Sequence, residues 1–315
     1  MAAIPPAAHP APWDGAGEAT RPGPVLIVGI RWELARLAAR LADLRWQDRP
    51  WGRLGVGRWP GCGVDVALAA AGIGKVSAAM AAQAALEALR PRAVVSCGSA
   101  GGLAPELRVG DLVLGDPVIA HDQGVFLPLA MARRHPAHRS DGFLPIGSPL
   151  PRGRRRSFRA DPALLTAAAA AARRAGLPSP HVGPLVTGDQ VILQDAARQW
   201  LRTAFAALAV DNETAAVAQV AHCHGVPWLA LRGVSDPASS DAAFDFTPFL
   251  RYQDDPARSA PGALGDFARR ARLALVQPAA ARRIQRFRQG ARRAMDAVAA
   301  LLDALLPALW PVTDR

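Results

Sequence analysis

Glycines and acidic residues gather in short segments of this sequence, and most of these segments directly follow a run of apolar residues. Carboxyl groups can donate or accept a proton during a reaction, so such segments are candidates for a catalytic site. One segment alone is a weak signal, because glycine-rich strand ends occur in most α/β proteins. The segments are Gly72-Ile-Gly-Lys75, Gly98-Ser-Ala-Gly-Gly102, Val109-Gly-Asp-Leu-Val113, Thr187-Gly-Asp189, Val210-Asp-Asn-Glu-Thr214 and Arg232-Gly-Val-Ser-Asp236.

The apolar runs alternate with stretches of helical periodicity, which predicts an α/β protein. Strands that are apolar throughout are typical of a sheet covered on both faces. We therefore expect a single-domain, three-layer α/β/α fold with a mixed, mostly parallel central sheet, in which ligands bind at the carboxyl ends of strands. The predicted strands cover residues 24–29, 64–70, 93–97, 112–119, 207–210 and 228–233, and the predicted helices cover 32–44, 75–89, 213–224 and 281–306.

One domain is expected over residues 24–306, flanked by two tails. Residues 1–23 are rich in Pro, Ala and Gly without an apolar period, which predicts a disordered N-terminal tail, and residues 307–315 are expected to form a C-terminal tail. Two irregular stretches, at about 132–160 and 237–262, are predicted to be inserted loops. Loops this long inside a compact domain are usually functional or flexible.

The formal net charge of +11 admits a nucleic-acid partner, but the sequence gives this partner little support. Lys75 is the only lysine, and an excess of arginine more often reflects a GC-rich genome. The basic run Arg152-Gly-Arg-Arg-Arg156 contains no aromatic residue for base stacking, and phosphate contacts alone give strongly salt-dependent binding. A non-catalytic module that binds nucleic acid or an acidic partner is therefore the weaker hypothesis.

The three cysteines, Cys62, Cys97 and Cys223, show neither metal-ligand nor disulfide-framework spacing. The histidines also lack ligand spacing with cysteine or carboxylate, so we expect no metal. The N-terminus has no basic region followed by an apolar stretch, which predicts no signal peptide. The longest apolar run, 297–312, is too short to span a membrane, and a cytoplasmic protein is expected.

The order and spacing of the segments resemble the family of 5'-methylthioadenosine and S-adenosylhomocysteine nucleosidases, within the nucleoside phosphorylase superfamily. In this family a GIGK turn, a GSAGG loop, a VGD strand start, an SGD loop, an acidic VEME helix start and a final SD occur in the same order. The resemblance covers residues 25–118 and 184–236, with the closing helix matching 282–306. It implies an enzyme without a cofactor that hydrolyses the N-glycosidic bond of an adenosine-type purine nucleoside.

The resemblance implies a general acid that protonates the base. Negative charge develops on the departing purine as the ribose becomes oxocarbenium-like, so a carboxylic acid is needed to protonate it. Asp236 matches this acid, with Ser235 beside it and the loop of Ser99, Ala100 and Gly101 as its neighbour. The alternative interpretation of Asp236 is an aspartate that caps a helix or closes a turn.

Two glutamates are implied at the ribose. Glu213 matches the family's ribose-binding glutamate, whose carboxylate can hold two hydroxyls, and Asn212 stands where the family has a methionine that packs on the sugar. Glu33 matches the glutamate that activates water, although it follows Gly29 one residue earlier than is common. The alternatives are a Glu213 stabilised only by the helix dipole and a solvated Glu33.

The resemblance also implies how the two ends of the nucleoside are bound. The backbone at Val191 and Ile192 matches the base-recognition segment, and Val191 replaces a phenylalanine, which reduces stacking on the base. Phe244 is a candidate for the pocket of the 5' substituent. Family members are commonly homodimers in which a neighbour closes this pocket, and residues 297–306 are a candidate interface; packing within one subunit is the alternative.

Phosphorolysis is the main alternative reaction. Phosphorylases of the superfamily, including relatives that remove adenine from lipid-linked adenosyl compounds in hopanoid synthesis, hold phosphate with arginines. Cys97 stands where hexameric phosphorylases usually have an arginine nearby, which favours water, whereas Arg31 could reach an anion at the end of the first strand. A carboxylate repels phosphate, so Glu33 discriminates between the two reactions.

Overall fold

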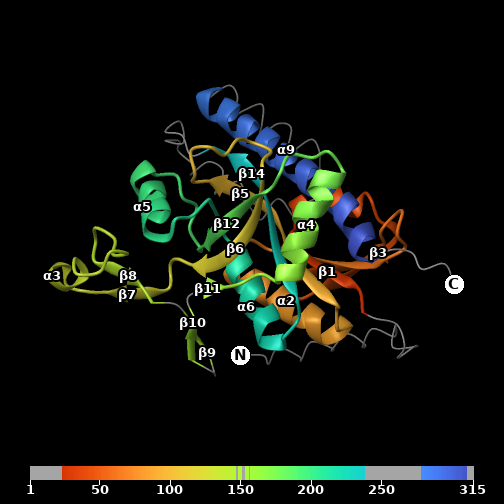
Figure 1. The fold of residues 1–315 in the computed structure, drawn as a ribbon, viewed down its shortest axis with the longest axis horizontal. Coiled ribbons are helices and arrows are strands. Elements are labelled where there is room, and N and C mark those ends of the chain that lie inside the picture. The colour runs from red at the N-terminus through yellow and green to blue at the C-terminus, as the bar shows by residue number, and fades with distance from the viewer. Residues whose placement is uncertain (1–22, 147, 151–152, 156, 238–277, 311–315) are drawn as a thin grey trace, which may run out of the picture.

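The computed structural model describes residues 23–146, 148–150, 153–155, 157–237 and 278–310 of the 315-residue chain. A ten-stranded sheet runs through the molecule, with helices on both sides (Figure 1). The strands of this sheet are β1 (Val25–Ile30), β2 (Ala42–Arg49), β3 (Gly52–Arg58), β4 (Asp65–Ala71), β5 (Ala93–Gly102), β6 (Leu112–Ala120), β11 (Ser157–Phe158), β12 (His181–Thr187), β13 (Ala209–Asp211) and β14 (Trp228–Asp236).

The sheet is mixed: β13 pairs with β5, and β14 with β6, in the antiparallel sense, whereas most other pairs near the centre are parallel. In spatial order the strands are β11, β6, β12, β13, β5, β1, β4, β3 and β2, and β14 pairs with both β5 and β6. β1 runs parallel to β4 and β5, and β14 runs parallel to β5. The carboxyl ends of these four strands therefore meet at one edge of the sheet, where three of the six glycine-rich or acidic segments lie, at the ends of β4, β5 and β14.

The helices form two outer layers, which confirms the predicted three-layer fold. On one side α2 (Lys75–Leu89) packs against α6 (Thr214–His224), and on the other α9 (Pro278–Leu309) lies along β14 and contacts α1 (Arg31–Ala38) and α4 (Pro162–Arg174) (Figure 1). Another helix, α5 (Asp195–Phe205), packs on β12. The buried face of α2 carries mostly alanine, and these small side chains allow the helix to pack closely on its neighbours. The buried residues are Ala78, Ala81, Ala82, Ala85 and Leu86.

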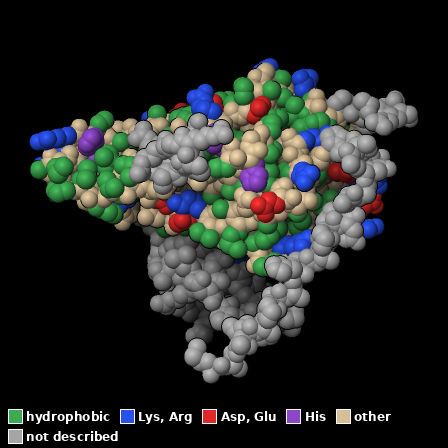
Figure 2. Space-filling model, turned by 90° about the horizontal axis from the view of Figure 1, so that it is seen from below, with side chains coloured by type: hydrophobic (Ala, Val, Ile, Leu, Met, Phe, Trp, Pro, Cys, Tyr) green, Lys and Arg blue, Asp and Glu red, His purple; other side chains and the backbone are tan. Residues whose placement is uncertain are grey.

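A small arm projects beside the main sheet. It contains the antiparallel pair β7 (Gly124–Phe126) and β8 (Phe143–Pro145) and the short helix α3 (Leu129–Ala132). Figure 2 shows apolar side chains on this arm, at the left of the view. Phe126 and Met131 are more than half exposed, so the arm presents apolar surface to its surroundings. A second small pair, β9 (Ser148–Leu150) with β10 (Gly153–Arg155), lies in the same part of the chain.

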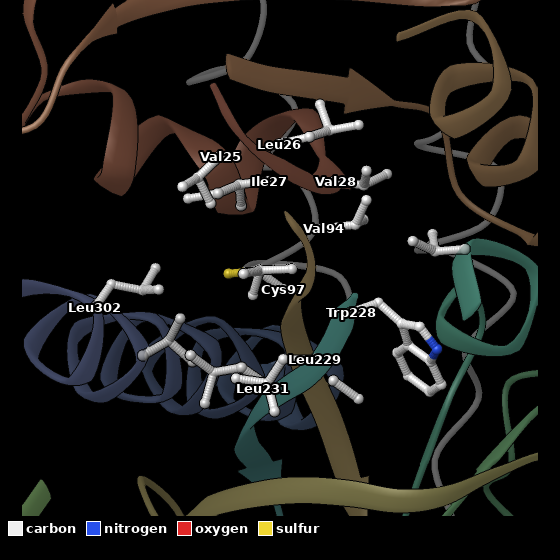
Figure 3. Packing of buried hydrophobic residues seen from close by; sticks show 14 of the residues in the cluster. Val25, Leu26, Ile27, Val28, Val94, Cys97, Trp228, Leu229, Leu231 and Leu302 are labelled. Carbon is white, nitrogen blue, oxygen red and sulfur yellow. The ribbon is translucent and has the colours of Figure 1, made fainter. Parts of the chain in front are cut away.

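The core explains why the strands read as continuous apolar runs. All six residues of β1 are buried, because helices cover both faces of the sheet. Figure 3 shows Leu302 of α9 on the same side as Cys97 of β5 and Leu231 of β14. Each fully buried aliphatic side chain of this kind contributes about 1.5–3 kcal/mol.

The predicted helix over 32–44 is wrong beyond Ala38. Helix α1 ends there, and β2 and β3 form an antiparallel hairpin on the edge of the sheet. An edge strand buries few side chains, and β2 has no fully buried residue, so its apolar residues carry no clear period. Tertiary pairing with β3 and β4 decides the structure here.

Three further elements were absent from the prediction: α4, β12 and α5. The alanine-rich α4 begins at a clear signal, since Asp161 accepts hydrogen bonds from the backbone N–H groups of Ala163 and Leu164 and Pro162 occupies the first turn. The stretch 132–160, expected as a loop, contains β8 to β11. Helix α9 continues through Leu309, beyond the expected domain boundary at 306.

Several expectations lie outside the described residues: the tail over 1–22, Phe244 and most of the loop at 237–262. Within the described ranges, no helix is both long and apolar enough to cross a bilayer.

Candidate active site

A buried arginine on β14 lies close to acidic residues at the ends of neighbouring elements. Arg232 is 1% exposed, and its Nη2 atom lies 2.6 Å from Oδ2 of Asp211 and 3.9 Å from Oε2 of Glu213. The same guanidinium donates hydrogen bonds to Thr214 Oγ1, at 2.7 and 2.9 Å, and to Ser96 Oγ, at 3.2 Å. A buried arginine needs such partners, so Arg232 fixes the positions of the carboxylates around it.

Glu33 reaches this cluster from the first turn of α1. Its side chain is buried, and Oε1 accepts hydrogen bonds from the backbone N–H of Ser99, at 2.8 Å, and from the Ser99 hydroxyl. Among the described residues, Oε2 has no hydrogen-bond partner. Burial raises the pKa of Glu33, and the nearby Arg232 opposes this effect. The structure therefore places Glu33 inside the site and not in solvent.

Glu213 lies at the start of α6. Its Oε1 accepts a hydrogen bond of 3.0 Å from the backbone N–H of Gly74, in the glycine turn after β4. Burial raises the pKa of Glu213 to about 7, with Arg232 lowering it and Asp211 raising it. This carboxyl group is therefore poised to change its charge near neutral pH, which a glutamate that only stabilises a helix dipole does not require.

Asp236 ends β14 and lies beside the strand end of β5. Its Oδ1 accepts a hydrogen bond of 2.7 Å from Ser235 Oγ, and its Oδ2 lies 2.7 Å from Nη2 of Arg198. The Ser235 hydroxyl is also 3.2 Å from the Ala100 carbonyl, and Asp236 pairs with Gly101 across the two strands. The segment expected to be a loop, Ser99 to Gly101, is part of strand β5.

The segment expected to recognise the base, at Val191 and Ile192, lies between β12 and α5. The Asn212 amide donates to the carbonyls of Gly188 and Gln190, the latter at 3.2 Å, so Asn212 holds this loop by its backbone. The Ile192 carbonyl accepts a hydrogen bond of 3.2 Å from Arg198 Nε, and the Val191 side chain is 52% exposed. The replacement of the family's methionine by Asn212 thus has a structural role in the loop.

Lys75 links its own glycine-rich segment to the segment that ends at Asp189 and to Asp122. Its Nζ lies 2.6 Å from Asp122 Oδ1, after β6, and its backbone N–H donates to Asp189 Oδ1 at 2.7 Å. The Asp189 N–H in turn donates to Asp122 Oδ2 at 2.8 Å. Because the Gly74 amide next to Lys75 holds Glu213, this network fixes the edge of the site around the glutamate.

A cavity of about 620 Å³ opens at the ends of β1 and β4, against the hairpin of β2 and β3. Ile30 and Ala71 are paired across these strands, which sets Arg31 beside Gly72 at the cavity. Within the described part of the chain, Arg31 has no ion-pair partner. The cavity is lined by Arg31, Asp48, Gly52, Arg53, Ala70, Ala71 and Gly72.

Sequence reasoning missed the two arginines, Arg232 and Arg198. A signal was present for Arg232, because an arginine within the apolar strand run of β14 demands buried carboxylates as partners. The signal for Arg198 was weaker. Arg198, Leu201 and Phe205 recur at helical spacing, which places the arginine on the buried face of α5. Cys97, at the floor of the site, is not a nucleophile, since burial raises its thiol pKa to about 12. In the described ranges, no cluster of three metal-ligating side chains is found.

The fold and the carboxylates at the strand ends define an α/β protein with a small-molecule site. The model of the phosphorylase superfamily matches residues 25–259, and the chain therefore belongs to this superfamily. It is similar to the 5'-methylthioadenosine/S-adenosylhomocysteine nucleosidase of Marinomonas sp. (strain MWYL1), with 34% identity over 72% of this chain and 90% of that protein. The nucleosidase of the same name from Geobacillus thermodenitrificans is 38% identical over 60% of this chain and 73% of its own length.

Solved structures support the same fold. The 5'-methylthioadenosine/S-adenosylhomocysteine nucleosidase of Neisseria meningitidis, in complex with methylthio-immucillin-A, has a TM-score of 0.65 at 23% identity and covers 90% of this chain and 98% of that one. The futalosine hydrolase of Helicobacter pylori has a TM-score of 0.63 at 20% identity and covers 90% and 96% of the two chains. At these identities the likeness concerns the fold.

Proposed function

We propose that this protein is a purine nucleosidase that hydrolyses the N-glycosidic bond of an adenosine-type nucleoside. Relatives at 34 and 38% identity are named as nucleosidases of this kind. The observation that carries the proposal is the free Oε2 of the buried Glu33, which lies in one site with Asp236 and Glu213. A glutamate held by Ser99 through one oxygen keeps the other available for a water molecule. The three carboxyl groups then have separate tasks at the water, the base and the ribose.

At the base, Asp236 delivers a proton to the purine N7 while the bond between C1' and N9 breaks. The electron pair of that bond moves to the purine, and protonation makes the base a better leaving group. Ser235 and Arg198 each bind one oxygen of Asp236, which fixes the direction of the carboxyl group. The carbonyl of Ile192 lies within the same network.

At the ribose, Glu213 accepts hydrogen bonds from the sugar hydroxyls. The Gly74 amide holds one of its oxygens, which leaves acceptor capacity for the sugar. A charged carboxylate binds hydroxyls more strongly than a neutral one, so the ionised form of Glu213 binds the substrate.

The nucleophile is water bound to Oε2 of Glu33. Glu33 takes one proton from this water as its oxygen attacks C1' from the face opposite the base. The products are the free purine, which keeps the proton from Asp236, and the free sugar, whose new C1' hydroxyl keeps the other proton of the water. Glu33 is left protonated and Asp236 ionised, and the return of one proton from Glu33 to solvent and of one from solvent to Asp236 restores the site. A phosphate ion at this position would face three carboxyl groups, Glu33, Asp211 and Glu213, whose charges oppose its own.

The substrate lies across the strand ends in a fixed order. Asp236, at the end of β14, donates its proton to the base. Glu33, beyond β5, activates the water that attacks C1' of the ribose. The next strands in that direction are β1 and β4, so we assign the 5' substituent to the cavity at Arg31 and Gly72. Its volume of about 620 Å³ admits a group as large as an amino acid. Arg53 is paired with Asp48 at 2.9 Å, so Arg31 is the cation that favours a substituent carrying a carboxylate.

We also infer a homodimer. Apolar side chains of one surface stripe, Ile73, Val76 and Met80, are between 50 and 71% exposed at the start and along the outer face of α2. Exposed stripes of this kind are typical of interfaces, and the arm that carries Phe126 offers further apolar surface. The occupant we propose is a second copy of this chain, as in the family that the sequence resembles.

A cytoplasmic location is part of the proposal. The thiols of Cys62 and Cys97 are free and buried, which suits a reducing compartment. Cell fractionation with an antibody against the protein tests this location, and recovery from the membrane or the medium would contradict it.

The experiment that tests the function is base release from purified protein. Methylthioadenosine, adenosylhomocysteine, adenosine and inosine are incubated with and without phosphate, and free base and sugar are separated by chromatography. We expect adenine from the adenosine-type compounds without phosphate, fastest for adenosylhomocysteine, and a rate lower by about 100-fold or more for the Asp236→Asn variant. Release that requires phosphate would make the protein a phosphorylase, and full activity of Asp236→Asn would contradict the assignment of the acid.

A further inference from the structure

Arg198 is an unexpected residue on the buried face of α5. The face is otherwise apolar, with Leu201 and Phe205, and the Arg198 side chain is only 5% exposed. Taking a guanidinium out of water is costly unless it is paired and its N–H groups are satisfied. The burial of Arg198 is therefore favourable only because of the groups that its guanidinium binds.

The guanidinium of Arg198 binds four groups from three segments. Nη2 lies 2.7 Å from Asp236 Oδ2, and Nη1 donates to the carbonyls of Pro237, at 2.9 Å, and Gly102, at 3.2 Å. Nε donates to the Ile192 carbonyl at 3.2 Å. These contacts join the end of β14, the end of β5 and the loop before α5. Asp236 is the only charged group among them.

We propose that Arg198 is a positioning residue for proton delivery to the base: it holds the Asp236 carboxyl group and the Ile192 loop in one arrangement. This inference rests on the proposed function. When the proton passes from Asp236 to N7 and the bond between C1' and N9 breaks, a carboxylate remains at Asp236. Arg198 already lies against that carboxylate, so the negative charge that forms on Asp236 is stabilised without rearrangement of the site.

The test compares two substrates that differ in their need for the proton. Adenine in methylthioadenosine leaves only after protonation, whereas nitrophenolate in 4-nitrophenyl riboside leaves without it. We expect Arg198→Met to lower kcat/KM for methylthioadenosine about 100-fold or more, the scale of general acid catalysis, and to change that for the nitrophenyl riboside by less than about threefold. The same selective loss is expected for Asp236→Asn, and Arg202→Met, on the exposed side of α5, is the matched control.

Two further variants keep the inference falsifiable if Arg198→Met is poorly folded. Arg198→Lys retains a cation near Asp236 and should restore part of the methylthioadenosine activity, and Arg198→Met combined with Asp236→Asn should be no slower than Asp236→Asn alone. Equal loss on both substrates, or losses that multiply in the double variant, would make Arg198 a merely structural residue. A wild-type protein that releases no base would instead overturn the proposed function itself.

Discussion

Glu33 and Arg232 lie against the α-carbon of the same residue, Gly98, although one comes from α1 and the other from β14. A Cβ atom at position 98 would overlap both Arg232 Nη1 and Glu33 Oε2. The glycine at this point in β5 is what allows a carboxylate and a guanidinium to meet over the strand. Its role is steric, and the neighbouring charges cannot move away easily because both side chains are buried.

Gly98→Ala is therefore expected to remove activity and to lower the free energy of unfolding by about 1–3 kcal/mol, the range for overpacking in a core. Urea unfolding and base release measure the two effects. The matched control for the free energy of unfolding is Gly101→Ala, whose added Cβ would lie at an ordinary contact distance of 3.4 Å from its nearest atom, Asp236 Oδ2. Equal unfolding free energies for wild type and Gly98→Ala would show that Glu33 and Arg232 do not meet over this strand.

The raised pKa of Glu213 predicts how activity depends on pH. Because the ionised form binds the ribose and the pKa is about 7, kcat/KM should rise about tenfold per pH unit below that value and level off above it. In Glu213→Gln this rise should disappear, with a higher KM throughout. A rise centred below pH 5 would mean that another group controls the profile.

The raised pKa of Glu213 also predicts that its contribution to the free energy of unfolding falls as pH rises, whereas kcat/KM rises. A carboxyl group whose pKa rises from 4.5 towards 7 on folding binds its proton more tightly in the folded state. The stability it contributes is present in full below pH 4.5 and is lost as pH rises through about 7. Urea midpoints between pH 5 and 8 should therefore fall less steeply for Glu213→Gln than for wild type, and parallel curves would contradict the shift.

Val191→Phe is a gain-of-function prediction. The Val191 side chain is about half exposed and stands where the resembled family has a phenylalanine that stacks on the base. An aromatic contact contributes about 0.5–1.5 kcal/mol, so the inhibition constant of adenine should fall roughly two- to tenfold. Val182→Phe, equally exposed but on β12 away from the loop, should leave adenine inhibition unchanged. The same constant for Val191→Phe and wild type would place the base elsewhere.

The proposed dimer predicts that a charge on α2 separates the subunits. Val76 is 71% exposed, so Val76→Asp costs little in an isolated subunit and breaks an apolar contact in a dimer. Sedimentation equilibrium should give a dimer for wild type and a monomer for the variant. Val182→Asp, outside the stripe, serves as the control. A monomeric wild type, or a dimeric Val76→Asp variant, would contradict the interface.

The sequence predicted best the parts of the fold that are buried on both sides. β1 and α2 lie within one or two residues of their expected bounds, since a continuous apolar run and an uninterrupted helical period determine them. The hairpin of β2 and β3 was not predicted, because an edge strand is held by its neighbours' hydrogen bonds and not by its own pattern. Helix α4 was missed in the stretch that the resemblance does not cover, and α5 was missed because no side chain caps its start.

The candidate site was predicted in part. Asp236, Glu33 and Glu213 lie at the strand ends where the order of the segments placed them. The arginines that hold them were not predicted, because Arg232 and Arg198 find their partners in segments distant in sequence. Such pairs arise from the folding of the sheet, and no local spacing reveals them. The hydrogen bonds from the Asn212 amide to the carbonyls of Gly188 and Gln190 were not predicted either.

The central claim is that Glu33 activates water at the ribose carbon. The most direct measurement identifies the sugar product by mass spectrometry for wild type and Glu33→Gln, each with and without phosphate, with the exposed Glu106→Gln as control. We predict free sugar as the only product, a rate that phosphate does not change, and a loss of about 100-fold or more in kcat for Glu33→Gln. A sugar 1-phosphate as the product, or phosphate-dependent activity that survives in Glu33→Gln, would contradict it.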